Sequence, residues 1–424
     1  MSVSEGWQWT SVGQVAEVES GPAFQSKLFG GPGEGLRLVR GDNIEPGRLR
    51  WNRTRTWPEA LMSGYEHLLL DRGDIILAMD RPIVAAGLKL ARVLPEDVPA
   101  LLVQRVARIR PREVHPDFLH YALQSQAFAD QLRRSFVGTQ IPHITLASIR
   151  DFRFLMPAME EQRRIVDILE DHLSRLDAAD QVLATSAMRL KSFTRAALEA
   201  MTRRSTVDTV PLADLVERIE AGKSFGSASR PAAADEWGII KVSAMTWGEF
   251  RPDENKVVGD TARVDPRYEI RSGDLLVSRA NTTEYVGAPV LVGQTRPKLL
   301  LSDKSLRLLP RTGWEPEYLL LLLSAPSART QMSALATGTK DSMRNISQGA
   351  LLSIQVPRVD QSEQVSIIAT ARAMTETATA LSVAVKNARD HSSALRSSLL
   401  ASAFSGRLTA GASSADQLKV AARV

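Results

Sequence analysis

Arginine and asparagine side chains that could read DNA bases stand at corresponding places in the two halves of this sequence. After one short β-rich run comes Asp80-Arg81, and after its counterpart comes Arg279-Ala280-Asn281-Thr282-Thr283. Arginine and asparagine can form two hydrogen bonds with guanine and adenine edges, each pair worth ~1–3 kcal/mol of base discrimination. We therefore predict DNA contacts from four residues: Arg81, Arg279, Asn281 and Thr282.

A second pair of polar loops follows about 60 residues later in each half. One reads Gly138-Thr139-Gln140-Ile141-Pro142-His143, and the other runs from Gly338 to Asn345. Small, hydroxyl and amide side chains together with a cation suit close approach to a phosphate backbone. For any single residue, a solvated turn remains an alternative. The further residues predicted to contact DNA are Gln140, His143, Lys340, Arg344 and Asn345, with Arg40 and Lys241 at the ends of earlier strands.

The sequence shows no recognisable catalytic or metal-binding motif. It has no Pro-Pro pair, so the Asn-Pro-Pro-aromatic motif of amino-methyltransferases is missing, and it has no cysteine and no His-Glu-x-x-His. Gly222-Lys223-Ser224 resembles the end of a phosphate-binding loop, but Glu217 occupies the place of the required glycine. The six histidines have no metal-ligand spacing. We predict a non-catalytic chain that binds neither a cofactor nor a metal itself.

These loops belong to a sequence that repeats itself about 200 residues apart. Val15-x-x-Val18-Glu19-x-Gly21-x-x-Phe24 returns as Val216-x-x-Ile219-Glu220-x-Gly222-x-x-Phe225, and Gly73-Asp74 returns as Gly273-Asp274. The offset stays near 200 through both halves, and the period is too long for a solenoid. We predict a tandem duplication of two similar domains, a first mixed domain at residues 1–157 and a second mixed domain at residues 206–357.

Each mixed domain is expected to be an α/β (mixed α+β) fold. Short β-rich runs at residues 74–79, 103–109 and 274–278 alternate with turn residues. Helical stretches are predicted at residues 116–134 and 316–335, each beginning with a proline in its first turn.

Two long helices are predicted, one after each mixed domain. Residues 160–201 contain no glycine or proline, and apolar residues recur there and in residues 362–405 at the spacing of a coiled coil. Val166, Leu169, Leu183 and Leu381 lie on these seams. The most economical arrangement pairs the helices as an antiparallel coiled coil, while packing of each helix on its own domain is the alternative. The spacer helices are assigned to residues 158–205 and 358–410, and residues 411–424 form a tail predicted to be flexible.

Charge and hydropathy limit the possible classes of protein. The net charge is +5, but residues 1–157 carry 19 basic and 17 acidic residues and residues 206–357 carry 18 of each. DNA binding would then use local patches or the positive field of partner subunits. The longest aliphatic run, residues 319–323, is too short to cross a bilayer. The absence of cysteine fits a reducing cytoplasm, which we predict as the location.

Both junctions between a mixed domain and a long helix carry a distinctive motif. Pro157-Ala158-Met159-Glu160-Glu161-Gln162 has its counterpart in Pro357 through Glu363-Gln364, which contains two additional residues, so its helix cap is expected to differ. The chain then reads Phe404-Ser405-Gly406-Arg407-Leu408 near its end. These motifs, with the duplication, resemble the specificity subunit of Type I restriction-modification systems.

The resemblance implies a function and a set of partners. Each mixed domain would be a target recognition domain that reads one half of a bipartite, asymmetric site on double-stranded DNA. Two methyltransferase (modification) subunits carrying S-adenosylmethionine would dock on the spacer helices, and restriction subunits would use ATP and Mg. The helix residues assigned to partner binding are Glu161, Gln162, Arg163, Glu363, Gln364, Arg396, Phe404 and Arg407, although Glu160, Glu161 and Gln162 are also expected to cap the first helix.

Two other classes of function are alternatives for this sequence. A non-catalytic DNA-binding adaptor or scaffold of another phage-defence assembly could use the same organisation. A self-contained methyltransferase-nuclease is disfavoured by the missing motifs. Because the loops of the two halves differ chemically, the two half-sites are expected to differ in sequence.

Overall fold

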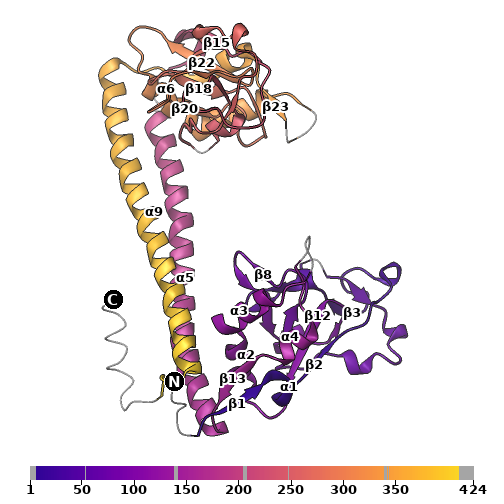
Figure 1. Cartoon of the computed structure of the whole chain (residues 1–424). Helices are drawn as coiled ribbons and strands as arrows, with labels where there is room; N and C mark the ends of the chain where they lie inside the picture. The colour runs from indigo at the N-terminus through magenta and orange to yellow at the C-terminus, as the bar shows by residue number, and fades with distance from the viewer. Residues whose placement is uncertain are drawn as a thin grey trace. The chain divides into compact units, whose positions relative to one another are not determined.

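A computed structural model describes residues 6–52, 54–137, 142–203, 208–246, 248–338, 341 and 343–409. The chain divides into two compact units, one made of residues 1–183 and 387–424 and the other of residues 184–386. Each unit contains one mixed domain and a part of both long helices (Figure 1). The predicted domain boundaries at residues 157, 205 and 357 separate the mixed domains from the helices, whereas the two units divide within the helices, so these boundaries stay predictions.

The two long helices occur close to where the sequence predicts them. α5 spans Met159–Thr202 and α9 spans Gln361–Phe404. Within the first unit they pack antiparallel, with the last turns of α9 beside the first part of α5, and Arg396 forms an ion pair with Asp177 at 2.7 Å (Figure 1). The predicted pairing of the helices is therefore confirmed.

The predicted apolar seam is less continuous than expected. Leu169 and Leu173 are buried, whereas Leu381 is 48% exposed. Residues 369–380 of α9 are mainly alanine and threonine, whose short side chains bury little apolar surface. Several larger apolar side chains on both helices consequently remain exposed, including Val182, Met188, Phe193 and Val383.

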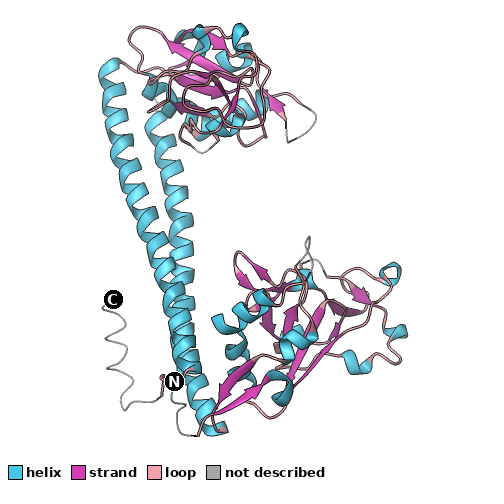
Figure 2. Ribbon diagram, in the orientation of Figure 1, coloured by secondary structure: helices cyan, strands magenta, loops and turns pink. Residues whose placement is uncertain are grey.

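The first mixed domain contains two small sheets with short helices beside them (Figure 2). The antiparallel sheet has the order β10 (Leu90–Arg92), β7 (Ile75–Ala78), β12 (Val106–Pro111), β2 (Ala16–Ser20). The second has the order β11 (Ala100–Leu102), β3 (Leu36–Val39), β6 (Thr56–Trp57). Two-stranded pairs are β1 (Gln8–Ser11) with β13 (Arg153–Met156), β4 (Ile44–Glu45) with β5 (Arg48–Leu49), and β8 (Ile83–Val84) with β9 (Gly87–Leu88).

The helices of this domain are α1 (Val12–Val15), α2 (Pro116–Leu123), α3 (Gln126–Arg134) and α4 (Leu146–Arg150). The single helix expected over residues 116–134 is thus two helices. Ser125 separates them, because its extended backbone and its hydroxyl, which accepts a hydrogen bond from the Phe128 amide at 3.4 Å, start a new helix.

The second mixed domain has the corresponding arrangement. Its antiparallel sheet has the order β15 (Val216–Ala221), β22 (Ser305–Pro310), β18 (Leu275–Ser278), β20 (Pro289–Leu291). The smaller sheet is β17 (Asn255–Val257), β16 (Gly238–Ile240), β21 (Leu299–Leu300). The pairs are β14 (Thr209–Pro211) with β24 (Gln355–Pro357) and β19 (Ala280–Asn281) with β23 (Arg344–Asn345). The helices are α6 (Pro316–Ser324), α7 (Pro326–Leu335) and α8 (Gln348–Leu352), so the helix expected over residues 316–335 also divides, at Pro326.

The repeated Gly-Asp motif has a structural role in both domains. Gly73 and Gly273 adopt φ angles of +90° and +88°, which a side chain would disfavour. The following carboxylate closes the turn: Asp74 accepts the Asp71 amide and Asp274 the Arg271 amide, both at 2.8 Å. Each carboxylate also pairs with an arginine of the neighbouring strand, at 2.7 Å and 3.0 Å.

The core of the first mixed domain is completed by the end of the chain. Ile75, Ile109 and Phe118 form one buried cluster with Leu400 and Ala403 of α9. The ring of Phe404 lies 5.1 Å from that of Phe118, centroid to centroid. Side chains of the C-terminal helix therefore form part of the core of the N-terminal domain. Among the described helices, none is long and apolar enough to cross a membrane.

Candidate nucleic-acid interface

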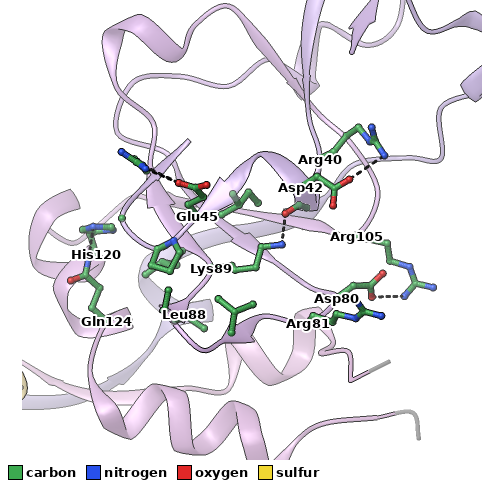
Figure 3. A pocket seen from close by; sticks show the side chains of 18 of the residues that line it. Arg40, Asp42, Glu45, Asp80, Arg81, Leu88, Lys89, Arg105, His120 and Gln124 are labelled. Carbon is green, nitrogen blue, oxygen red and sulfur yellow. Dashed lines mark hydrogen bonds and ion pairs between the residues drawn. The ribbon is translucent and has the colours of Figure 1, made fainter. Parts of the chain in front are cut away.

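A cleft of about 1800 Å³ with both polar and apolar lining opens on the first mixed domain, between its loops and the adjoining parts of α5 and α9. The cleft brings together Arg40 and Arg81, two of the predicted DNA contacts, which lie 41 residues apart in the sequence (Figure 3). Lys89, Arg105 and Arg48 line it as well, and the sequence reasoning did not select them. Arg105 could have been found, because Lys304 stands at the same place in the repeat, also one residue before a strand.

Two of the cations that line the cleft, Arg40 and Lys89, are engaged by contacts within the chain. The guanidinium of Arg40 lies 3.6 Å from the carboxylate of Asp42. Lys89 donates a hydrogen bond to the carbonyl of Gly41, and burial lowers the pKa of Lys89. Lys89 thus ties the end of the β8–β9 hairpin to the loop that carries Arg40 (Figure 3).

Arg81 begins the β8–β9 hairpin with an unusual backbone conformation. Its φ angle is +46°, and its amide donates to the carbonyl of Pro142 at 2.8 Å. His143 forms backbone bridges with Asp80 and Val137, so the two predicted contact loops are joined. Arg81 is exposed and His143 partly exposed, whereas Gln140 lies outside the described residues.

In the second mixed domain the structure gives two predicted contact residues internal roles. The amide of Asn281 is only 9% exposed; it donates to the Ser278 hydroxyl at 3.2 Å and accepts the Thr282 amide at 2.8 Å. The guanidinium of Arg344 donates to the carbonyls of Gly338, at 3.0 Å, and Ala336. These side chains therefore shape their own loops, and the base or phosphate contacts assigned to them stay predictions.

Other predicted residues of the second domain remain accessible. Thr282 and Asn345 are exposed and Arg279 is partly exposed. Lys241 lies 3.4 Å from Glu254 in a partly exposed ion pair. Lys340 lies outside the described residues. The β19–β23 pairing joins the two loops here through Asn281 and Arg344, as bridges join them in the first domain.

The glutamines of the two Glu-Gln junctions have one shared structural role. Gln162 accepts the amide of His115 and donates to the carbonyl of Pro157, both at 2.8 Å. Gln364 accepts the amide of Glu315 at 3.0 Å and donates to Gly313 at 3.1 Å. His115 and Glu315 are the residues that start α2 and α6.

Each glutamine therefore fastens a long helix to the first short helix of its domain. Gln162 and Gln364 are 2% and 1% exposed. Both side chains are occupied by contacts within the chain, and the partner binding assigned to them stays a prediction. Gln162 caps the neighbouring helix and not its own.

Replacing Gln162 by alanine is expected to destabilise the first unit by about 1–3 kcal/mol, because a buried amide and a buried carbonyl lose their hydrogen-bond partner. Denaturant unfolding measures the change. Arg163→Ala, at the next and exposed position, is the control and should shift the midpoint by less than about 0.5 kcal/mol. An equal loss of unfolding free energy in both variants would contradict the anchoring role of Gln162.

The remaining helix residues divide into internal and accessible ones. Arg396 is engaged by Asp177 and Asp180, and Phe404 packs on Phe118. Both therefore make contacts within the chain. Exposed Arg163 and Arg407, with partly exposed Glu161 and Glu363, stay predictions for partner binding.

The second junction has its own helix cap, as its two additional residues suggested. Asp360 accepts the Glu363 amide at 2.8 Å and the Ser362 hydroxyl at 2.7 Å, and these hydrogen bonds lower the pKa of Asp360.

A buried histidine lines the inner wall of the cleft (Figure 3). His120 is 8% exposed and its Nε2 lies 2.7 Å from Nε2 of Gln124. Burial, together with the charge of Arg92, lowers the pKa of His120 to about 4. The imidazole is therefore neutral in the folded protein at neutral pH.

This histidine predicts acid sensitivity of the first unit. The unfolded chain takes up the proton near pH 6.5 and the folded chain near pH 4, so stability is full above 6.5 and falls by about 3 kcal/mol as pH drops to 4. Unfolding of His120→Gln as a function of pH should lack this part of the slope. His391→Gln, at an exposed position, controls for loss of a histidine; an unchanged slope in His120→Gln would contradict the prediction.

Comparisons with known proteins agree on one family. A model of the family described as "Type I restriction modification DNA specificity domain" matches residues 4–184. The EcoAI specificity subunit of Escherichia coli is 31% identical over 184 residues, 43% of this chain and 31% of that subunit. The MjaVIII specificity subunit of Methanocaldococcus jannaschii is 29% identical over 170 residues, 40% of each chain. These alignments span only about a third to two-fifths of those relatives.

Other similarities extend over almost the whole chain. The EcoKI specificity subunit of Escherichia coli is 24% identical over 425 residues, which cover 96% of this chain and 90% of that subunit. A chain from a structure described as showing complex assembly and conformational transition of the type I R-M system has a TM-score of 0.72 at 20% identity, covering 96% of this chain and all of that one. The HsdS subunit of Thermoanaerobacter tengcongensis has a TM-score of 0.54 at 19% identity, covering 96% and 99%. Residues 4–184 thus match the DNA specificity domain of Type I restriction-modification systems, and the chain is similar over almost its whole length to specificity subunits of those systems.

Proposed function

We propose that this chain is the non-catalytic subunit that selects the DNA site of a Type I restriction-modification enzyme in the cytoplasm. The observation that carries the proposal is a pair of domains with matching sheet order whose polar loops lie at matching places with different side chains. Each domain then reads one half of a bipartite, asymmetric site on double-stranded DNA. Six basic side chains line the cleft against four acidic ones, and this local excess of positive charge would attract phosphate more than the near-neutral first domain does as a whole.

The long helices would hold the partner subunits. Exposed apolar side chains on α5 and α9, among them Met188, Phe193 and Val383, suit packing against partner helices. Two methyltransferase subunits would bring S-adenosylmethionine and methylate adenine in each half-site, and restriction subunits would add ATP- and Mg-dependent cleavage. The chain itself would position the partner subunits on the DNA and would catalyse no reaction.

Sequencing of modified bases tests this function. The chain is co-expressed with the methyltransferase subunit encoded beside it, and methylated adenines are mapped with and without the chain. A split, asymmetric motif that depends on this chain is the expected result. A soluble complex without any motif would favour a scaffold in another defence assembly, and methylation or cleavage by the purified chain alone would contradict a non-catalytic role.

The assignment of half-sites to domains is tested by Arg279→Ala. Arg279 is partly exposed and directly precedes β19, so its loss should relax one or more base positions in the half-site of the second domain and leave the other half unchanged. Arg263→Ala removes a more exposed arginine of the same domain, and should leave the motif as it is. Relaxation in both half-sites would show that Arg279 acts on general affinity.

A further inference from the structure

The first mixed domain presents a β-hairpin with an apolar tip. In this hairpin β8 pairs with β9 through Ile83–Leu88 and Val84–Gly87, and the amide of Lys89 donates to the carbonyl of Pro82 at 2.7 Å. The tip consists of Val84, Ala85 and Ala86, all exposed. These three side chains are purely aliphatic, so none of them can donate or accept a hydrogen bond.

At the equivalent place the second mixed domain has a different structure. The described residues 282–287 form a tight turn in which the amides of Tyr285 and Val286 both donate to the carbonyl of Thr282, at 3.0 and 2.9 Å. Val286 is fully buried, whereas Thr282, Thr283 and Glu284 are exposed. The same position in the duplicated fold thus presents methyl groups in one domain and polar groups in the other.

Cations flank the hairpin on the cleft side. Arg81 precedes the hairpin and Lys89 follows it, and Arg105 lies 3.9 Å from Asp80 at its base. Val84, Ala86 and Leu88 line the cleft together with these cations. Figure 3 labels Leu88 beside Lys89, with Arg81 and Arg105 nearby. Two hydrogen bonds hold the base of the hairpin, one from the Arg81 backbone amide to the Pro142 carbonyl and one from the Lys89 ammonium to the Gly41 carbonyl.

This combination of shape, charge and side-chain chemistry fits the major groove of DNA. The groove is about 12 Å wide and admits a two-stranded β-ribbon. Phosphates border it on both sides, which matches cations beside an apolar tip. The apolar group that base pairs present in this groove is the C5-methyl of thymine, and alanine-sized side chains can contact it.

Resting on the proposed function, we propose that the tip of the β8–β9 hairpin reads a thymine methyl group in the half-site bound by the first mixed domain. Val84, Ala85 and Ala86 contact the methyl, and Arg81 and Arg105 bind the adjoining phosphates, while Lys89 holds the hairpin in place through its hydrogen bond to Gly41. The domain then recognises this base by apolar contact, while the second domain, with polar residues at the same place, uses hydrogen bonds.

Deoxyuridine substitution tests the contact directly, since it removes the methyl group and leaves base pairing unchanged. The full-length chain in complex with its methyltransferase subunit is titrated with duplexes in which each thymine of the methylated motif, on either strand, is replaced singly. The unmodified complex is expected to lose about three- to tenfold in affinity at one or two positions, all in one half-site. The combined variant Val84→Ser, Ala85→Ser, Ala86→Ser should bind thymine and uracil duplexes equally at those positions.

A matched variant and a folding check accompany this experiment. Thr283→Ala changes an exposed residue at the equivalent place of the second domain, and should retain the thymine preference in the first half-site. Hydrogen exchange of β7 and β12 should be the same in the hairpin variant and the parent, because the altered side chains are exposed.

Three results would overturn the inference. Affinity that is insensitive to every uracil substitution excludes a methyl contact, and a hairpin variant that keeps the preference places the contact elsewhere. Loss of the methyltransferase subunit from the hairpin variant, with base preference intact, makes the tip a protein contact. Failure of the proposed function itself is distinguishable, because the parent complex would then show no sequence-dependent binding to any duplex.

Discussion

Leu400→Ala is expected to destabilise the first unit by about 2–5 kcal/mol and to leave the second unit as stable as before. Leu400 is 5% exposed and belongs to the same cluster as Ile75, Ile109 and Phe118 of the first mixed domain. Removal of a buried leucine side chain loses its transfer free energy and leaves a cavity. A substitution near the end of the sequence therefore acts on the domain near its beginning.

Hydrogen exchange resolves this effect by region. Amides of β7 and β12 should lose protection in the variant, whereas amides of β18 and β22 should not change. Leu381→Ala is the control on the same helix: its side chain is 48% exposed, so the change should stay within about 0.5 kcal/mol. Equal loss of protection in both units would show that the chain unfolds as one body and would contradict the local role of Leu400.

Lengthening both long helices is expected to widen the gap between the half-sites without altering their sequences. Seven residues inserted after Leu183 and seven after Lys386, the boundary between the two units, add about 10.5 Å to each helix. At ~3.4 Å per base pair, the gap grows by at most about three base pairs. A seven-residue insertion also nearly preserves the phase of the apolar seam, with a drift of about 20°.

Mapping of methylated adenines with the lengthened chain reads out both parts of this expectation. An insertion in α5 alone is the contrasting variant; it makes the paired helices unequal in length and should reduce the yield of methylated motif. New half-site sequences from the doubly lengthened chain would show that the helices influence base reading, and an unchanged gap would remove their role as a spacer.

The elements with strong periodic patterns were predictable from sequence. α5 and α9 begin and end within one residue of the stretches at residues 160–201 and 362–405, because these stretches combine regular apolar spacing with the absence of glycine and proline. The wider assignments, residues 158–205 and 358–410, extend up to six residues beyond the helices. Pro116 and Pro316 start α2 and α6 as expected, since proline fits the first helical turn. The break at Ser125 was missed because a serine inside an apolar pattern does not distinguish an N-cap from a helical residue.

The candidate site was only partly predictable. Arg40 and Arg81 lie in one cleft, but Lys89 stood in a segment without a repeat signal and was overlooked. Asn281 has the right chemistry for reading adenine, yet its amide bonds to Ser278 and Thr282. Residue type shows what a side chain can bind, whereas the nearest partners decide what it does bind.

The amino-acid sequence by itself determined the duplication, the long helices and the kind of residue in each loop, because these follow from local spacing along the chain. Only the tertiary structure decided which side chains remain available. It buried Gln162 and Gln364 as anchors between helices, and placed Leu400 and Phe404 in a core begun by residues almost 400 positions earlier. Such contacts depend on how elements distant in sequence pack to exclude water, and packing of this kind leaves no periodic trace in either partner alone.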